Sequence, residues 1–200
     1  MSSCDCSVEI ETKEQKKVLI ILLTINAVMF VVELVVGIIA ESTGLIADSL
    51  DMLADATVYC IGLYAVGKSM SAKANAAFIS GVFQILLSIL VAVDILRRFF
   101  IGSEPESTFM IAIGCIALFA NTICLMIISK HKNGEIHMRA SWIFSKNDVI
   151  ANIGLIIAGL LVLILGSRWP DLLIGAIIVA VVFRGGLSII KQTRYESNKG

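Results

Sequence analysis

The sequence carries no net charge and few charged residues of either sign. Sixteen lysines and arginines balance sixteen aspartates and glutamates, and charged residues make up 16% of the 200 positions. Proteins that bind nucleic acid usually present a basic patch or an excess of positive charge, and this composition offers no such excess. The sequence therefore predicts no nucleic-acid partner.

Histidine is scarce as well, because His131 and His137 are the two in the whole chain. Their spacing forms no His-x-x-x-His pair, and no serine–histidine arrangement indicates an activated nucleophile. We therefore expect that the protein is not an enzyme. Both histidines are interpreted as residues of a solvated loop.

Apolar residues, by contrast, are abundant, at 58% of the chain with a mean hydropathy of +0.91. A helix needs about 20 apolar residues to cross a bilayer core of about 30 Å. The chain contains six such runs, and we predict an all-α, polytopic membrane protein with six transmembrane helices. The predicted spans cover approximately Val18–Ala40, Leu45–Gly67, Ala76–Phe100, Thr108–Ser129, Arg139–Leu165 and Pro170–Ile190.

Positive charge is distributed unequally between the two sides of this arrangement. Six spans place both termini on one side, which holds eleven cations, whereas the opposite side holds three. The positive-inside rule then predicts cytoplasmic N- and C-termini, in a plasma (inner) membrane. The expected organisation is an N-terminal tail (1–17), a six-helix membrane domain (18–190) and a short C-terminal tail (191–200).

Three aspartates interrupt the second apolar run, where "ADSLDMLADA" contains Asp48, Asp51 and Asp55. An aspartate near the middle of a membrane helix costs about 2.5–3.5 kcal/mol on insertion scales. Spacings of three and four residues place all three side chains on one face of the helix. We therefore predict that this face lines a cavity and meets protein, water or a cation.

The fifth run supplies a second polar face in "SKNDVIANIG". Asp148 and Asn152 are four residues apart and share a face, with Asn147 beside them. At about 1.5 Å per residue, Asp55 lies roughly 15 Å from the outer start of its span and Asp148 roughly 14 Å from the inner start of its own. The two helices run in opposite directions, so we expect their polar faces to meet near the middle of the membrane.

Carboxylate and amide oxygens at one site suit a divalent cation in charge and in donor type. When the metal leaves, the crowded carboxylates repel one another and burial disfavours their charged forms, so protons should take its place. A site that binds either metal or protons has the minimum chemistry of an exchanger. The alternative is a hydrogen-bonded cluster of protonated aspartates that serves only to hold helices together.

The segment "GLIADSLDMLADA" resembles the second-span motif of the cation diffusion facilitator family, in which His or Asp is followed four residues later by Asp. Asp51 and Asp55 occupy these positions. The resemblance extends over nearly the whole chain and implies a transporter that exports a divalent transition metal by proton antiport with alternating access. Its further landmarks, in the family's order, are Glu33 before Gly37, Asp94 and Arg98, Asn121, and "WPD" at Trp169–Asp171.

Two features depart from the family pattern. The fifth span usually reads His-x-x-x-Asp, and Asp148 matches the Asp, but Phe144 stands at the histidine position. Zinc favours an imidazole nitrogen, so Asn147 and Asn152 become the candidates for the missing ligand. The family usually carries a cytoplasmic metal-binding domain after its sixth span, and we expect a short form without it, in which a homodimer is one candidate assembly.

The resemblance and the residues together give one predicted site. Asp51, Asp55 and Asp148 bind the ion, Asn152 is the expected fourth donor, and Asp48 lies on the outer side of the path. Zn²⁺ is the first expectation for the transported ion, with Cd²⁺, Co²⁺, Mn²⁺ and Fe²⁺ as alternatives. The competing hypothesis is a membrane metal sensor or regulatory subunit that does not transport.

A second, cytoplasmic metal site is a weaker hypothesis. Cys4 and Cys6 form "CDC" in the N-terminal tail, on a side of the membrane where disulfides are rare. Thiolates select soft ions such as Zn²⁺, Cd²⁺ and Cu⁺. Two thiolates are an incomplete ligand set, so the pair is either part of a secondary site or incidental.

Overall fold

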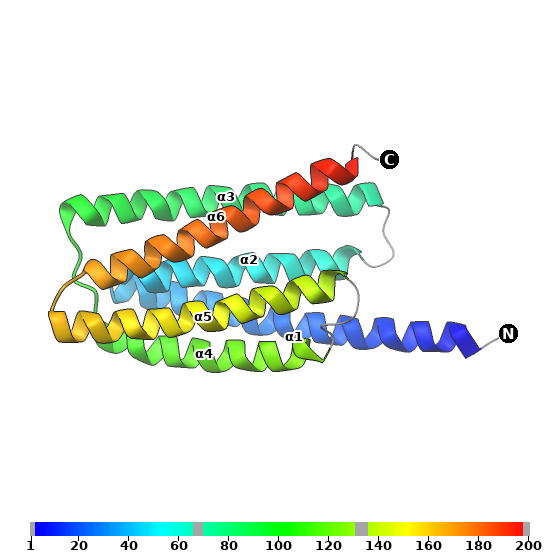
Figure 1. The fold of residues 1–200 in the computed structure, drawn as a ribbon, viewed down its shortest axis with the longest axis horizontal. Helices are drawn as coiled ribbons and strands as arrows, with labels where there is room; N and C mark the ends of the chain where they lie inside the picture. Colours follow the sequence, from blue (N-terminus) through cyan, green and yellow to red (C-terminus); the bar gives the residue numbers. More distant parts are fainter. Residues whose placement is uncertain (1–2, 66–69, 131–135, 198–200) are drawn as a thin grey trace.

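The structure is a computed structural model that describes residues 3–65, 70–130 and 136–197, and it consists of six α-helices that run alternately up and down (Figure 1). The predicted all-α class with six helices is confirmed. The helices are α1 Ser3–Ile39, α2 Thr43–Ala65, α3 Met70–Ile101, α4 Ser107–Ser129, α5 Ile136–Leu165 and α6 Trp169–Ser197.

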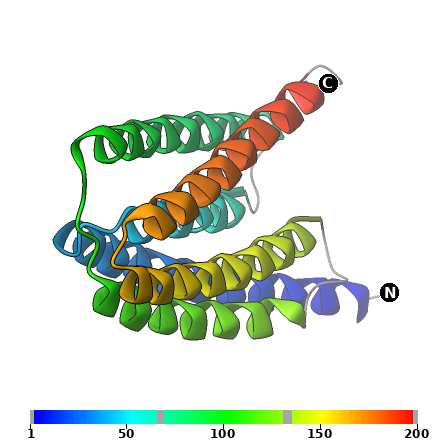
Figure 2. The same ribbon diagram turned by 60° about the vertical axis from the view of Figure 1, so that its left-hand side comes forward.

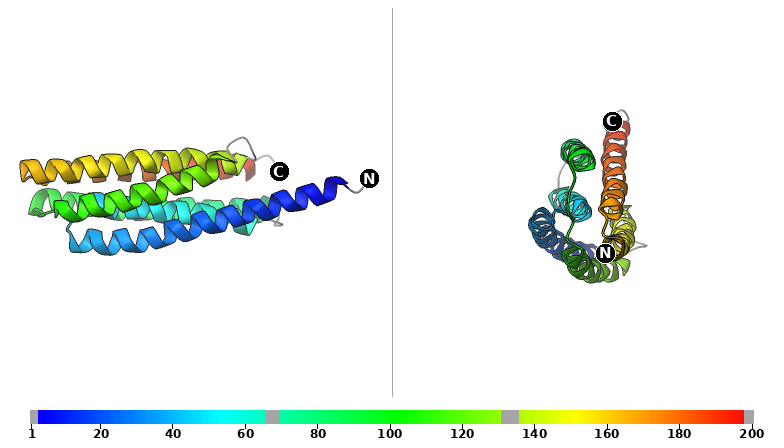
Figure 3. Two further views of the ribbon diagram at one scale, coloured as in Figure 1. Left: turned by 90° about the horizontal axis from the view of Figure 1, so that it is seen from below. Right: turned by 90° about the vertical axis from the view of Figure 1, so that its left-hand side faces the viewer.

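Two helices extend well beyond their predicted apolar runs. The helix α1 begins at Ser3 instead of Val18, and α6 ends at Ser197 instead of Ile190. In both places the helix continues into polar sequence, which an apolar run cannot reveal. The N-terminal part of α1 therefore projects past the ends of the other helices (Figure 3).

Among the described residues, five helices are long and apolar enough to cross a membrane, and α2 is not one of them. The helix α2 has 23 residues, but it carries three aspartates. It is also the one described helix that packs against all five others. Its acids can therefore face protein instead of lipid, which is the arrangement that intramembrane carboxylates require. The five spans are Lys16–Ile39, Asn75–Ile101, Ser107–Ser129, Ser145–Leu165 and Trp169–Lys191.

The outer faces of the surrounding helices are apolar. Phe100 on α3, Phe119 on α4 and Ile164 on α5 have exposed fractions of 78%, 69% and 75%. The interior is formed by small clusters, such as that of Met29 and Met52 between α1 and α2. An apolar exterior around helices that satisfy their own backbone hydrogen bonds is the arrangement that hydrocarbon allows.

A buried aspartate from α6 caps the N-terminus of α2. Asp171 is fully buried, and its carboxylate accepts hydrogen bonds from Ser42 Oγ at 2.7 Å, from the Thr43 amide at 2.7 Å and from the Gly44 amide at 2.9 Å. The first amides of a helix have no partner within the helix and carry partial positive charge, so a carboxylate stabilises them. This contact fixes the start of α2, and with it the positions of the aspartates that follow.

The same end of the bundle is tied together by α3 and α4. Arg98 is buried, donates to Asp94 Oδ2 at 2.6 Å and also donates to the backbone carbonyl of Glu41. The Glu106 amide donates to the Ala40 carbonyl at 2.9 Å. The tight turn between α1 and α2, where Glu41 has a φ of 49°, is therefore held by two neighbouring segments.

The helix α6 crosses the bundle obliquely, from α2 at one end to α3 at the other (Figure 2). A Cβ added at Gly175 would lie 2.8 Å from Thr43 Cγ2, at the start of α2. A Cβ added at Gly186 would lie 3.0 Å from the Gly81 carbonyl oxygen, near the start of α3. Glycine at these positions allows the close backbone approach on which both contacts depend.

Candidate metal centre

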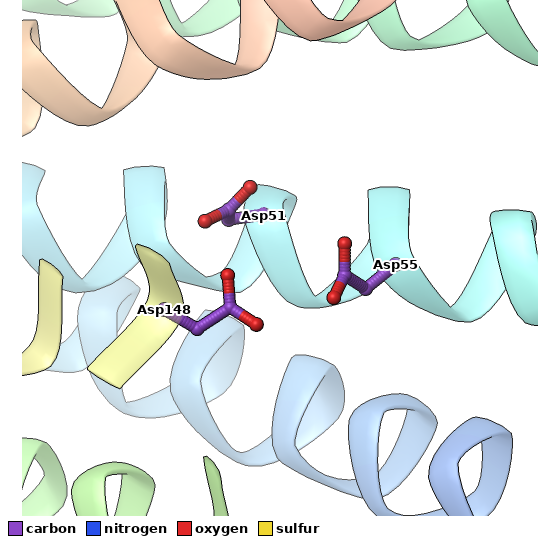
Figure 4. A group of neighbouring side chains, drawn as sticks. All are labelled: Asp51, Asp55 and Asp148. Carbon is purple, nitrogen blue, oxygen red and sulfur yellow. The ribbon is translucent and has the colours of Figure 1, made fainter. Parts of the chain in front are cut away.

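Three aspartates converge between α2 and α5. Asp51, Asp55 and Asp148 each offer one carboxylate oxygen, and these three oxygens lie within 4.8 Å of one another. Figure 4 shows the Asp148 carboxylate directed toward the two aspartates of α2. Asp55 and Asp148 are each 6% exposed, and Asp51 is partly exposed. The polar faces predicted for the two helices therefore do meet.

Local spacing on antiparallel helices explains the convergence. Asp51 and Asp55 are one turn apart on α2, so their side chains project from the same face. Farther along, Tyr59 of α2 lies opposite Ser145 of α5, with their hydroxyl oxygens 3.4 Å apart. Asp55 precedes Tyr59 by four residues and Asp148 follows Ser145 by three, so the antiparallel register brings these two acids to the same level.

Tyr59 is a site residue that the sequence analysis missed. Its side chain is 1% exposed, and its hydroxyl donates to Asp55 Oδ2 at 3.2 Å. The hydrogen bond fixes the orientation of one carboxylate from outside the trio. The signal was present in the sequence, because Tyr59 follows Asp55 by four residues and so shares its face. Ser145, at 1% exposed, precedes Asp148 by three residues and shares its face, but its proximity to Tyr59 depends on the register of α2 against α5.

Asn152 is fully buried on α5, one turn beyond Asp148. Its side-chain nitrogen donates to the Asp148 carbonyl at 2.8 Å, and its side-chain oxygen has no hydrogen-bond partner. A buried amide oxygen that accepts no hydrogen bond lacks a partner, and a metal ion is a chemically suitable partner for it. Asn147, in contrast, is exposed, although it is adjacent to the buried Asp148. The structure therefore separates the two asparagines that the sequence left as alternatives.

Asp48 is fully buried, and neither of its carboxylate oxygens has a hydrogen-bond partner. It is not one of the three acids whose oxygens converge. Cys4 and Cys6 fall in the first turns of α1, and Phe144 falls on α5, but their side chains lie outside the described residues.

The donor set of the trio suits a divalent cation. In a tetrahedral site, zinc–oxygen bonds of about 2.0–2.2 Å place two ligand oxygens roughly 3.4 Å apart. Oxygens already within 4.8 Å of one another reach that spacing by small side-chain rotations. Three carboxylates carry more negative charge than one divalent ion neutralises, so the cluster also has capacity for protons once the ion leaves.

Fold and site together define a class of protein. The apolar exterior and five candidate membrane spans indicate a membrane protein, and its buried carboxylates converge between α2 and α5. The family that matches is described as the cation efflux transmembrane domain, and the match covers residues 19–196. The chain belongs to the cation efflux family, which is a family of transporters and not of enzymes.

Individual relatives are distant. A "cadmium, cobalt and zinc/H(+)-K(+) antiporter" of Bacillus velezensis is 28% identical over 120 residues, which is 59% of this chain and 38% of that protein. A "zinc transporter ZitB" is 26% identical over 126 residues in Yersinia pseudotuberculosis and 25% identical over 128 residues in Escherichia coli. Each ZitB alignment covers 62% of this chain and 40% of the relative, so the chain spans about two fifths of the length of these curated relatives.

Proposed function

We propose that this chain exports divalent transition-metal ions from the cytoplasm in exchange for protons, with zinc as the first substrate. The observation that carries the proposal is the convergence of Asp51, Asp55 and Asp148 between two antiparallel helices. The relatives of this chain include proteins named as zinc transporters and as a cadmium, cobalt and zinc/H(+)-K(+) antiporter. Co²⁺ and Cd²⁺ are therefore alternative substrates, and the all-oxygen donor set adds Mn²⁺ and Fe²⁺.

In this proposal the three aspartates bind the ion, and the free amide oxygen of Asn152 is the fourth donor. Tyr59 orients Asp55 through its hydroxyl. We assign no ligand role to Asn147, whose side chain is exposed. Release of the metal exposes the carboxylates to one another, and protons then neutralise them, so one ion type replaces the other.

The proposed transport unit comprises residues 18–190, with α2 as the sixth transmembrane span. Both termini face the cytoplasm of a plasma (inner) membrane, in agreement with the excess of lysine and arginine on their side. Alternating access follows when the group that contains α2 and α5 moves against the remaining helices. The homodimer stays a prediction from the sequence.

A vesicle assay tests the proposal. The purified protein is reconstituted in vesicles that contain a pH-sensitive dye, and Zn²⁺, Cd²⁺, Co²⁺ or Mn²⁺ is added outside. We expect the lumen to become more alkaline when the metal enters, because protons leave in exchange. Asp55→Asn should abolish the signal, whereas Glu106→Gln, which changes an exposed acid outside the site, should not.

Two outcomes would contradict the proposal. Metal-dependent proton flux that survives Asp55→Asn would show that the trio is not the transport site. Tight zinc binding without flux in the wild-type protein would instead support the metal sensor or regulatory subunit considered from the sequence.

A further inference from the structure

Two buried acids outside the trio have no hydrogen-bond partner. Glu33 on α1 and Asp48 on α2 are both 0% exposed. All four of their carboxylate oxygens are unpartnered. Buried charges are normally paired, hydrogen-bonded or bound to a metal, and the described ion pairs of this protein join Arg97 and Arg98 to Asp94 instead. These four oxygens therefore have none of the described hydrogen bonds or ion pairs that normally offset the free-energy cost of burying a charged group.

The packing of α1 against α2 brings the two acids to the same level. Met29 and Met52 belong to one buried cluster, and a Cβ added at Gly37 would lie 3.0 Å from Leu45 Cβ. On α1, Glu33 lies midway between Met29 and Gly37, four residues from each. On α2, Asp48 lies between Leu45 and Met52. The Glu33 carboxyl group lies within electrostatic range of Asp48 and also of Asp51 in the trio.

The pair lies one step outward from the trio. Asp48 precedes Asp51 by three residues, which is about 4.5 Å along a helix axis. The step leads toward the end where the turn between α1 and α2 is held by Asp171 and Arg98. The pair therefore lies between the proposed metal site and the end of the bundle that contains this turn.

We propose that Glu33 and Asp48 form a second binding position for a divalent cation, outward of the trio. Two carboxylates match the charge of one such ion, and their four free oxygens supply donors of the type that Zn²⁺ and Mn²⁺ accept. This inference rests on the proposed function, because the second position would be an additional ion-binding site on the same transport path. An ion that leaves the trio is held there before it is released at the outer face.

Equilibrium dialysis with radioactive Zn²⁺ tests the second position. The protein is purified in detergent as the full chain with Cys4→Ser and Cys6→Ser, so that the N-terminal thiols bind no ion. At saturating zinc we expect two ions per chain in this background and one in Glu33→Gln. The matched control is Glu14→Gln, an exposed acid on the same helix, which should retain two.

A reciprocal variant and a partner variant make the test independent of one substitution. Asp51→Asn combined with Asp148→Asn should leave one ion, which is then lost when Glu33→Gln is added. Asp48→Asn should reproduce the loss seen in Glu33→Gln, and it replaces that variant if size-exclusion chromatography shows that Glu33→Gln does not fold.

The outcomes separate this inference from the proposed function. One zinc ion in the background protein, unchanged by Glu33→Gln or Asp48→Asn, overturns the second position and leaves the trio intact. No bound zinc in the background protein overturns both. Two ions in the background protein and in every Glu33 and Asp48 variant also overturn the second position.

Discussion

Tyr59 contacts the proposed metal site through one hydrogen bond, from its hydroxyl to Asp55 Oδ2 at 3.2 Å. Groups that orient a metal ligand from behind typically contribute about 10–100-fold to metal affinity. Tyr59→Phe removes the hydroxyl and leaves the buried ring. We therefore expect zinc affinity to fall about ten-fold, measured by calorimetry, while the thermal unfolding temperature changes little.

The matched control is Tyr64→Phe on the same helix, where the side chain is 50% exposed. It should leave zinc affinity unchanged. An equal loss in both variants, or no loss in Tyr59→Phe, would contradict the role assigned to the hydroxyl.

A substitution at Phe144 can test which side chain determines the metal selectivity of the proposed site. It precedes Asp148 by one helical turn, on the same face of α5. Phe144→His introduces an imidazole nitrogen, which zinc prefers over manganese. We expect the affinity for Zn²⁺ relative to Mn²⁺ to rise roughly ten-fold, a change of about 1.4 kcal/mol. Phe144→Leu, which adds no nitrogen, is the control and should leave the ratio unchanged, as competition dialysis would show.

Spacing along one helix predicted the chemistry of the candidate site, but not its full extent. Asp51, Asp55 and Asp148 could be found because four-residue spacing and membrane depth depend on local geometry alone. The contact of Ser145 with Tyr59 and the pairing of Glu33 with Asp48 depend on the register between helices. That register is set by side-chain packing, such as Met29 with Met52, which a single sequence does not encode in any periodic form.

At the scale of a helix, Asp171 anchors α2 by capping it from α6. Its carboxylate accepts three hydrogen bonds while fully buried, and hydrogen bonds to a charged group contribute about 1.5–3 kcal/mol each. Asp171→Asn keeps the shape but removes the charge and one acceptor. We expect the free energy of unfolding to fall by about 2 kcal/mol, measured by denaturant titration in detergent.

Glu106→Gln is the control for this cap. Glu106 is the N-cap residue of α4, but its side chain makes no capping hydrogen bond. Its substitution should change the free energy of unfolding by about 0.5 kcal/mol or less. Equal effects of the two variants would show that Asp171 contributes only its charge near a helix end.

The contact between α3 and α6 depends on Gly186. An added Cβ would lie 2.9 Å from Ile85 Cγ1 and 3.0 Å from the Gly81 carbonyl oxygen. Gly186→Ala should therefore reduce the free energy of unfolding by about 1–3 kcal/mol, through overpacking.

The neighbouring Gly185 provides the matched control. There the nearest atom to an added Cβ is Gln84 Nε2 at 3.6 Å, an ordinary contact. Alanine forms helices better than glycine by up to about 1 kcal/mol, so Gly185→Ala should be neutral or stabilising in the same denaturant titration. The two variants differ in sign, and a similar loss in both would contradict the close approach.

The helices themselves were predictable where apolar sequence defines them. The run expected at Thr108–Ser129 agrees with α4, Ser107–Ser129, because Pro105 and polar residues bound it. The start of α1 and the end of α6 were not predicted, since polar residues continue both helices. The central place of α2 was also not predicted, because its three aspartates indicate burial without naming the helices that surround it.

For the whole molecule, the proposed orientation can be tested by labelling. Glu104 is exposed between α3 and α4, and Glu14 is exposed near the N-terminus. In a background without the five native cysteines, we expect Glu104→Cys to react with a membrane-impermeant maleimide on intact cells. Glu14→Cys should react only after permeabilisation. The reverse pattern would place both termini outside.

The oblique course of α6 has a consequence for proton leakage during the proposed transport cycle. The helix contacts α2 near Gly175 and α3 near Gly186, eleven residues further along, as it crosses the bundle (Figure 1). A helix moves largely as a rigid element, so a tilt of α6 that separates one of these contacts also displaces the other. In the proposed transport cycle, α6 therefore links the movement of α2 to that of α3, and we expect this link to prevent both sides of the bundle from opening to water at once.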